Sequence, residues 1–438
     1  MSKACQAHLR PPVPYAFLTA SAGCREDWDD GRFTLYSTTV KQPNDTGPGN
    51  LSSRYLESLM TFRLLHSTSR RQITMPTPSL PQTTKALILR QSPPERKPLF
   101  HDAVIQEQEI PQLKPGEVLV KMGAVAFNHR DLWIRKGMYP RIKIGSTFGA
   151  DGAGTVIASS DPSDPLLNQR VFLTPMRGWE SDPDGPESTF GMLGSGAFPP
   201  LGTFSEYVVV ERKEVLKTPA HLNDEQIAAW PLAGLTAWRS IALAKISKGD
   251  AILITGIGGG VALLALQICA AMGVHVFVTS GSQSKIDKAV KLGAKGGVLY
   301  SDGSWPDALG QLLKQHRIQQ LSAVIDSGGA EIMVKTSKYL KYGGRVVCYG
   351  MTAAPSISMT MREVMRAQQL IGTTMGSRAD MIAATEFIAE HRIVPAVAAV
   401  LQGLEAAEQG FEMMEKGSQF GKIIIKLGKE DTQGKANL

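Results

Sequence analysis

The chain has 438 residues, of which 43% are hydrophobic and 20% are charged, and its formal net charge is +7. This length is enough for two globular domains with cores of their own, at roughly 100–200 residues per domain. Basic residues are scattered among acids and not clustered with aromatic residues, so the charge indicates solubility and argues against a nucleic-acid partner. No segment has the roughly 18 uninterrupted apolar residues of a membrane helix, so we expect no membrane partner.

Residues 1–82 are expected to form a disordered leader or extension, because Pro, Ser, Thr and Asn are frequent and no apolar periodicity is sustained. Within this region, residues 60–85 contain three arginines, many hydroxyl side chains and no acid, which is typical of a mitochondrial presequence. An acidic patch at residues 26–30 precedes it, which a presequence would avoid. Either the true start is Met60 or Met75, or the segment is a linker, which we favour. We therefore expect a cytoplasmic protein, or a mitochondrial one if residues 60–85 act as a presequence.

The segment from Lys85 to about residue 221 predicts a β-rich domain. Short alternating runs are separated by Gly, Pro and Asp turns: KALILR, GEVLVKMGAVAFN, GTVIAS, RVFLTP and FSEYVVVE. Near the end of the chain, the run GKIIIKLG has the same texture, and we expect it to pair with this domain.

Strands and helices alternate from about Leu222 onward, starting with a helical pattern that Asn223 would cap. Six apolar strands are expected at 251–255, 274–279, 296–300, 321–327, 344–350 and 369–375. Near-continuous apolar strands of this kind are buried on both faces, which predicts a doubly wound parallel sheet in an α/β fold.

A glycine turn follows the first of these strands and opens a helix. Its pattern, G-x-x-G-x-x-A, places Gly256, Gly259 and Gly260 where backbone N–H groups approach a pyrophosphate, with the small Ala262 where helix meets sheet. The alternative, an ordinary strand–helix connection, is disfavoured by the six strands in series.

The acidic residue that usually holds the 2′-hydroxyl of NAD about 20 positions later is absent. Thr279 and Ser280 stand there, followed by Gly281, Ser282 and Lys285. Hydroxyl groups, a glycine and a cation suit a 2′-phosphate, so we expect NADP(H), with Ser280, Ser282 and Lys285 as phosphate contacts. A solvated lysine in the first turn of the helix is the alternative for Lys285.

These motifs, in order, resemble the medium-chain dehydrogenase/reductase superfamily, in particular its zinc-free branch of quinone oxidoreductases and enoyl reductases. The resemblance covers about residues 85–427 and is carried by VAFNHRDLWIRKGMYP (125–140), GADGAGTV (149–156), WPLAGLTAW (230–238), the glycine turn, VIDSGG (324–329) and GGRVVCYG (343–350). It implies a GroES-like catalytic domain over 83–221, completed by 376–428, and a Rossmann domain over 222–375, before a tail over 429–438. It also implies a homodimer with its active site in the cleft between the domains.

The resemblance also bears on metal binding. Zinc alcohol dehydrogenases have a cysteine ligand where this chain has Asn128, and a histidine ligand where it has Ala150. No Cys lies between residues 25 and 268, so the three ligands of a catalytic zinc and the four of a structural one are both missing. His129 and Asp151 alone do not make a site, and we expect no metal.

Position in the matching motifs gives the candidate catalytic residues. Asn128 and Asp131 would lie near the substrate, Tyr139 at the mouth of the pocket, and Thr236 against the nicotinamide amide. Alternatively, Asp131 only caps a helix, Tyr139 packs in a turn, and Thr236 bonds within its helix.

Further cofactor contacts are expected at the carboxyl edge of the sheet, from Tyr349 and Gly350. Arg378 would reach the cofactor phosphate or the substrate, or make a surface salt bridge. The loop at 176–207 is long enough for a lid, with Trp179 and Phe190 as apolar substrate contacts.

The sequence therefore predicts an NADP(H)-dependent reductase of quinones or α,β-unsaturated carbonyl compounds, which accept hydride without a Lewis acid. Two alternatives stay open: an alcohol dehydrogenase acting on a small alcohol or aldehyde, and a nucleotide-binding partner or sensor that does not turn over.

Overall fold

A computed structural model describes residues 80–93, 95 and 100–427 of the chain, and all of them lie in one unit, Pro76–Leu438. Several of the segments predicted from the sequence lie outside the described residues. They are residues 1–79 of the predicted leader, with most of the presequence-like segment and both candidate start methionines at 60 and 75, and the tail at 429–438. None of the described helices is long and apolar enough to cross a membrane.

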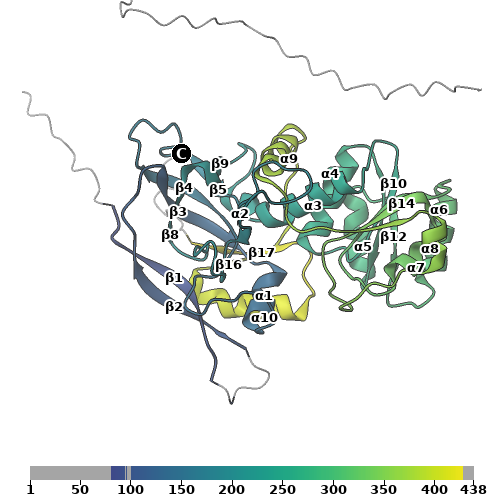
Figure 1. Cartoon of the computed structure of the whole chain (residues 1–438), viewed down its shortest axis with the longest axis horizontal. Helices are drawn as coiled ribbons and strands as arrows, with labels where there is room; N and C mark the ends of the chain where they lie inside the picture. Colours follow the sequence, from purple (N-terminus) through teal and green to yellow (C-terminus); the bar gives the residue numbers. More distant parts are fainter. Residues whose placement is uncertain (1–79, 94, 96–99, 428–438) are drawn as a thin grey trace, which may run out of the picture. The chain divides into compact units, whose positions relative to one another are not determined.

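The predicted β-rich segment supplies five strands of a seven-stranded sheet, and the C-terminal part of the chain supplies the other two (Figure 1). Its strands are β3 (Glu117–Ala126), β4 (Asp151–Ser159), β5 (Arg170–Leu173), β8 (Tyr207–Glu211), β9 (Val215–Lys217), β16 (Val397–Gln402) and β17 (Lys422–Lys426). They follow the order β16-β17-β3-β4-β5-β9, and β8 also pairs with β3. The predicted return of the C-terminal strand is confirmed, because β17 runs antiparallel to β3 with Ile424 opposite Ala126.

Two smaller strand pairs accompany this sheet. β1 (Thr83–Arg90) pairs with β2 (Asp102–Glu109), and β6 (Met176–Arg177) pairs with β7 (Gly191–Met192). Short helices lie between the strands of this part of the chain or follow them: α1 (His129–Arg135), α2 (Asp224–Ala228) and α10 (Ala407–Lys416).

The six predicted apolar strands form one parallel sheet, which confirms the doubly wound fold. They are β10 (Ala251–Ile254), β11 (His275–Ser280), β12 (Gly296–Leu299), β13 (Leu321–Asp326), β14 (Leu340–Cys348) and β15 (Gln369–Gly372). Their order is β12-β11-β10-β13-β14-β15, so the direction of winding reverses between β10 and β13. Ligands of such sheets bind in the crevice at that reversal, outside the carboxyl ends of the strands.

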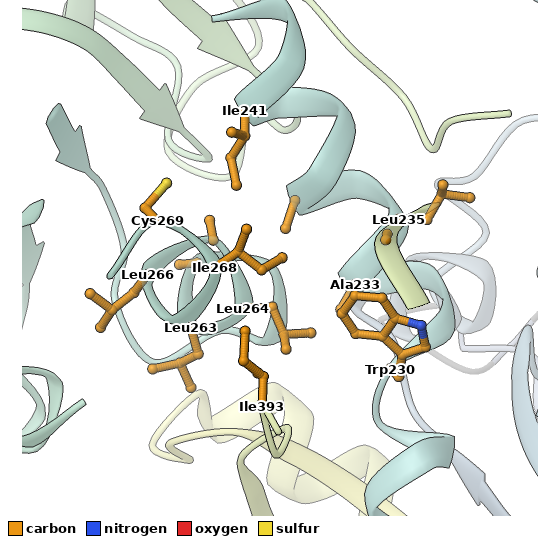
Figure 2. Close-up of a cluster of buried hydrophobic side chains, with 14 of the residues drawn as sticks. Trp230, Ala233, Leu235, Ile241, Leu263, Leu264, Leu266, Ile268, Cys269 and Ile393 are labelled. Atoms are coloured by element: carbon orange, nitrogen blue, oxygen red, sulfur yellow. The ribbon is translucent and has the colours of Figure 1, made fainter. Parts of the chain in front are cut away.

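Alternating residues of β10, a central strand of the parallel sheet, pack against helices on opposite faces of the sheet. Ile252 and Ile254 join a core with α3 (Pro231–Leu243), α4 (Gly260–Ala271), α5 (Gln283–Lys291) and α9 (Arg378–Glu390). Leu253 joins a second core with α6 (Trp305–Gln315) and α7 (Ile332–Thr336). Figure 2 shows part of the first core, with side chains of α3 and α4, Trp230 beside Ala233 and Leu235, and Ile393 beneath α4. Both faces of the sheet are therefore covered.

Candidate functional site

One cavity of about 460 Å³ lies where the two sheets approach each other. Its wall combines residues of α1, the start of α3, the glycine turn, the segments after β13 and β14, and the start of β17. The glycine turn and the carboxyl ends of β13 and β14 place it at the reversal of the parallel sheet, where the fold locates a ligand.

The glycine turn presents bare backbone to this cavity. Gly256 and Gly258 have φ values of 64° and 130°, which favour glycine, and α4 begins at Gly260 after Gly259, with no side chain capping the helix. Gly256, Gly259 and Gly260 line the cavity, whereas Ala262 is fully buried within α4. Backbone N–H groups at a helix start suit a pyrophosphate, and this contact stays a prediction.

The predicted 2′-phosphate contacts lie beside this turn, and they differ in how available they are. Ser280 is buried, and its hydroxyl donates to the Ile257 carbonyl at 3.5 Å and accepts from the Ser282 N–H at 3.2 Å. Ser282 is partly exposed and exchanges a hydrogen bond with Ser284. Lys285 lies over the turn, since a Cβ on Gly258 would be 3.0 Å from its Cδ, and its ammonium donates to the Gly417 carbonyl at 3.1 Å.

Three polar side chains form a buried cluster that borders the same cavity. The Lys422 ammonium donates to the Asn128 side-chain oxygen and, at 2.9 Å, to the Asp151 carboxylate. The Asn128 amide donates to the same carboxylate at 2.9 Å, and the Leu232 backbone N–H donates to its other oxygen at 2.8 Å. Asn128 and Lys422 line the cavity, while Asp151 is fully buried behind them.

Asp131 takes the alternative role that the sequence allowed. It is fully buried and does not line the cavity; its carboxylate accepts the backbone N–H of Asn128 at 2.8 Å, closing the start of α1. Burial raises the pKa of Asp131 from 3.8 to about 6, although Arg130, the Asn128 N–H and Lys422 oppose the shift. Asp131 therefore positions Asn128 and does not face a ligand.

The other candidate residues, Thr236, Tyr139, Tyr349 and Gly350, line the cavity, and two of them already contact other protein groups. The Thr236 hydroxyl donates to the Leu232 carbonyl at 2.7 Å, within its own helix. The Arg130 guanidinium stacks on the Tyr139 ring, with its Cζ 4.9 Å from the ring centroid. Tyr349 and Gly350 follow β14 and reach the same wall.

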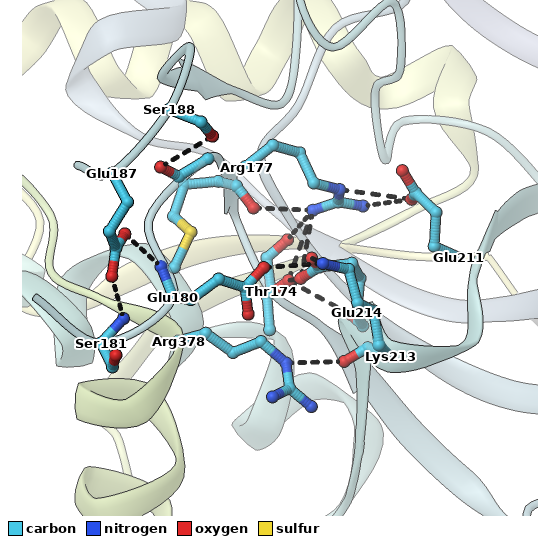
Figure 3. Close-up of polar contacts among 12 residues, drawn as sticks. Thr174, Arg177, Glu180, Ser181, Glu187, Ser188, Glu211, Lys213, Glu214 and Arg378 are labelled. Carbon is cyan, nitrogen blue, oxygen red and sulfur yellow. Dashed lines mark hydrogen bonds and ion pairs between the residues drawn. The ribbon is translucent and has the colours of Figure 1, made fainter.

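Arg378, Trp179 and Phe190 lie elsewhere. The Arg378 guanidinium donates to the Lys213 carbonyl at 2.9 Å, in the polar network of Figure 3, so it does not line the cavity. Trp179 and Phe190 pack edge to face at 6.0 Å, and Arg239 stacks on Trp179. The expectation that these two rings contact the substrate is wrong, because they face each other and not the cavity.

The loop at 176–207 is held by a carboxylate. Glu187 accepts the backbone N–H groups of residues 180, 181 and 182 at 2.6–2.7 Å. These hydrogen bonds lower the pKa of Glu187 from 4.5 to about 2. One residue of the loop, Met192, does line the cavity.

Lys422 is the site residue that sequence reasoning missed. It begins the strand KIIIK, and a lysine in a buried part of a strand signals a partner or a function. Arg130 and Trp133 line the cavity and were also missed. Within the described ranges, no three His, Cys, Asp or Glu side chains are grouped so as to hold a metal ion.

Comparisons with known proteins agree with this architecture. A family model for the alcohol dehydrogenase GroES-like domain matches residues 114–220, and one for zinc-binding dehydrogenase matches residues 260–390. The zinc-type alcohol dehydrogenase-like protein YogA of Leptosphaeria maculans is 42% identical over 72% of this chain and 91% of its own. Acryloyl-coenzyme A reductase of Metallosphaera sedula is 26% identical over 73% and 95%. A crystal structure of an NAD-dependent alcohol dehydrogenase superposes with a TM-score of 0.68, at 29% identity, over 78% of this chain and all of the other.

Proposed function

The chain belongs to the medium-chain dehydrogenase/reductase superfamily, and we propose that within it this protein is a metal-independent, NADP(H)-dependent reductase of quinones or α,β-unsaturated carbonyl compounds. The observation that carries the proposal is the buried Lys422–Asn128–Asp151 cluster. Asn128 stands where the zinc-dependent enzymes have a cysteine ligand, and Asp151 follows Ala150, which stands where they have a histidine ligand. A fixed ammonium bonded to the one carboxylate there opposes a second cation, and an amide and Ala150 replace the soft ligands.

The substrate class follows from this cluster. Oxidation of a simple alcohol requires help in ionising the hydroxyl, which a zinc ion would supply. Quinones and conjugated enones accept hydride directly and need only hydrogen bonds to the oxygen that becomes negative. The similarity to an acryloyl-coenzyme A reductase supports conjugated carbonyl compounds as substrates.

The choice of NADP(H) rests on the region around the glycine turn. The turn provides the N–H groups for a pyrophosphate, and the partly exposed Ser282 and Lys285 lie next to it. No acidic residue ends β11, whose last residue is Ser280. A 2′-phosphate would meet a cation there and not a carboxylate.

We also propose a homodimer, whose interface would lie on a surface formed by β15 and the helix before it, none of whose residues line the cavity. β15 is an edge strand of the parallel sheet, and the helix before it, α8 (Met361–Met365), exposes Met361, Val364 and Met365. Unpaired strand edges beside exposed apolar side chains are suited to pairing with a second copy. Light scattering on the wild type and on Met365→Glu tests this: a dimer that the substitution weakens is expected, and a wild-type monomer overturns it.

The test of the proposed reaction is cofactor oxidation by the full chain. NADPH and NADH are offered in turn with a panel of quinones, enones, aldehydes and alcohols, with and without a chelator. We expect chelator-resistant reduction of quinones or enones with NADPH preferred. Turnover that the chelator abolishes and zinc restores, with simple aldehydes or alcohols as best substrates, would overturn it in favour of an alcohol dehydrogenase.

A further inference from the structure

The cavity contains a buried cation whose three donors are not all used. A lysine ammonium has three N–H groups, and Lys422 gives two of them to Asn128 and Asp151. The side chain is 6% exposed and borders the cavity, and no third partner is recorded among the described residues. One donor therefore remains for a ligand in the cavity.

The ammonium is held by Asp151 at the start of β4 and by Asn128, the residue before α1. Its stem crosses the start of α4, since a Cβ on Gly260 would be 2.8 Å from the Lys422 Cδ. Asp151 is itself fixed by the Leu232 N–H at 2.8 Å, and the Asn128 oxygen faces the ammonium while its amide faces the carboxylate. A donor fixed before the reaction needs little reorganisation when charge develops nearby.

We propose that Lys422 is a catalytic residue of this enzyme: its ammonium hydrogen-bonds the substrate carbonyl oxygen and stabilises the negative charge that forms there, while Asn128 and Asp151 position it. This inference rests on the proposed function and assigns to a side chain the electrostatic task that a Lewis-acid metal would perform. Neither sequence motif nor spacing indicated it.

The electron balance of the step is that of conjugate reduction. When bound, NADPH would supply a hydride to the β-carbon of the enone and would become NADP⁺. The C=C π pair moves between the α-carbon and the carbonyl carbon, and the carbonyl π pair moves to oxygen, giving an enolate. Lys422 stays protonated and donates to this oxygen, and a proton from water then completes the α-carbon.

The first test measures binding and not turnover. The probe is 4-nitrophenol, whose phenolate form absorbs at longer wavelength and resembles the enolate in charge. Wild-type protein is expected to bind the phenolate in the cavity and to lower the apparent pKa of the phenol. Lys422→Met should weaken phenolate binding more than about tenfold, whereas Lys422→Arg should retain most of it. The matched control is Lys426→Met, on the same strand, whose ammonium pairs with Glu225 at 3.1 Å outside the cavity.

The second test is kinetic. Lys422→Met should lower kcat for enones by about 10²–10³-fold, the usual effect of removing one oxyanion donor, with the Kd for NADPH within about threefold of wild type. The double variant Lys422→Met/Asp151→Asn removes the unpaired carboxylate that the single variant leaves buried, so it separates misfolding from lost chemistry. It should fold and bind NADPH, yet stay as slow as the single variant.

The outcomes distinguish the two proposals. If the wild type reduces enones and Lys422→Met does so with the same kcat, the role of Lys422 is overturned and the proposed function stands. The same conclusion follows if Lys422→Met loses NADPH affinity but keeps its kcat. A wild type that reduces no quinone or enone overturns the proposed function. Phenolate binding that depends on Lys422 would still support the anion-stabilising role in that case, and its absence would remove that role too.

Discussion

Lys285→Ala is expected to weaken NADPH binding about 5- to 30-fold and to leave NADH binding nearly unchanged. A hydrogen bond to a charged group contributes about 1.5–3 kcal/mol. Lys285 is partly exposed, and its ammonium already donates to the Gly417 carbonyl at 3.1 Å. A phosphate would replace this hydrogen bond and water contacts, so the net gain in binding free energy is smaller than the full value. We therefore expect a loss of about 1–2 kcal/mol, which corresponds to the stated change in Kd at 1.4 kcal/mol per factor of ten.

The assay is fluorescence titration of each cofactor, with Lys288→Ala as the matched control. Lys288 lies one turn further along α5, and its ammonium lies 5.5 Å from the Phe420 ring centroid, on the same surface. The control should change neither Kd. Equal losses for NADPH and NADH, or no loss for either, would refute the assignment of Lys285 to the 2′-phosphate.

Three further predictions concern stability and pH. Leu264→Ala, in the core of Figure 2, should lower the free energy of unfolding by about 2–5 kcal/mol in urea denaturation, while exposed Val400→Ala should change it little; equal effects would contradict the packing described. Because Asp131 has a pKa raised from 3.8 to about 6, the folded state binds its proton more tightly than the unfolded state, so this residue makes stability fall as pH rises through that window. Asp131→Asn should flatten the stability profile there, and an unchanged slope would count against it. Glu187, with its pKa lowered from 4.5 to about 2, should stabilise the 176–207 loop fully above pH 4.5 and progressively less as pH falls toward 2. Limited proteolysis of Glu187→Gln should cut this loop faster at neutral pH, and equal cutting would show that the three N–H contacts do not hold it.

Local patterns predicted the parallel sheet and the glycine turn because their causes are local. Apolar runs mark strands buried on both faces, and a backbone turn with φ at 64° and 130° needs glycine at Gly256 and Gly258 wherever it occurs. Gly256, Gly259 and Gly260 of this turn line the cavity, and their contact with a pyrophosphate stays a prediction.

Contacts between distant segments could not be predicted in this way. Lys422 meets Asn128 and Asp151 from 294 and 271 residues away, so no spacing in the sequence connects them. Trp179 was placed in the right loop, but which way its ring faces depends on Arg239 and Phe190. Arg378 has a suitable charge, yet the Lys213 carbonyl takes its guanidinium.

The position of β17 has a consequence for synthesis of the chain on the ribosome. β3 is made about 300 residues before β17, and all six strands of the parallel sheet are made between them. Until β17 emerges, the segment of β3 from Ala124 to Ala126 lacks its partner strand and presents an open edge in a nascent chain. Ribosome pausing within residues 250–420 would prolong this exposure and favour aggregation. The same delay keeps the cavity incomplete, since Lys422 arrives with the last strand, so a chain interrupted before that point would have the glycine turn but not the buried cation.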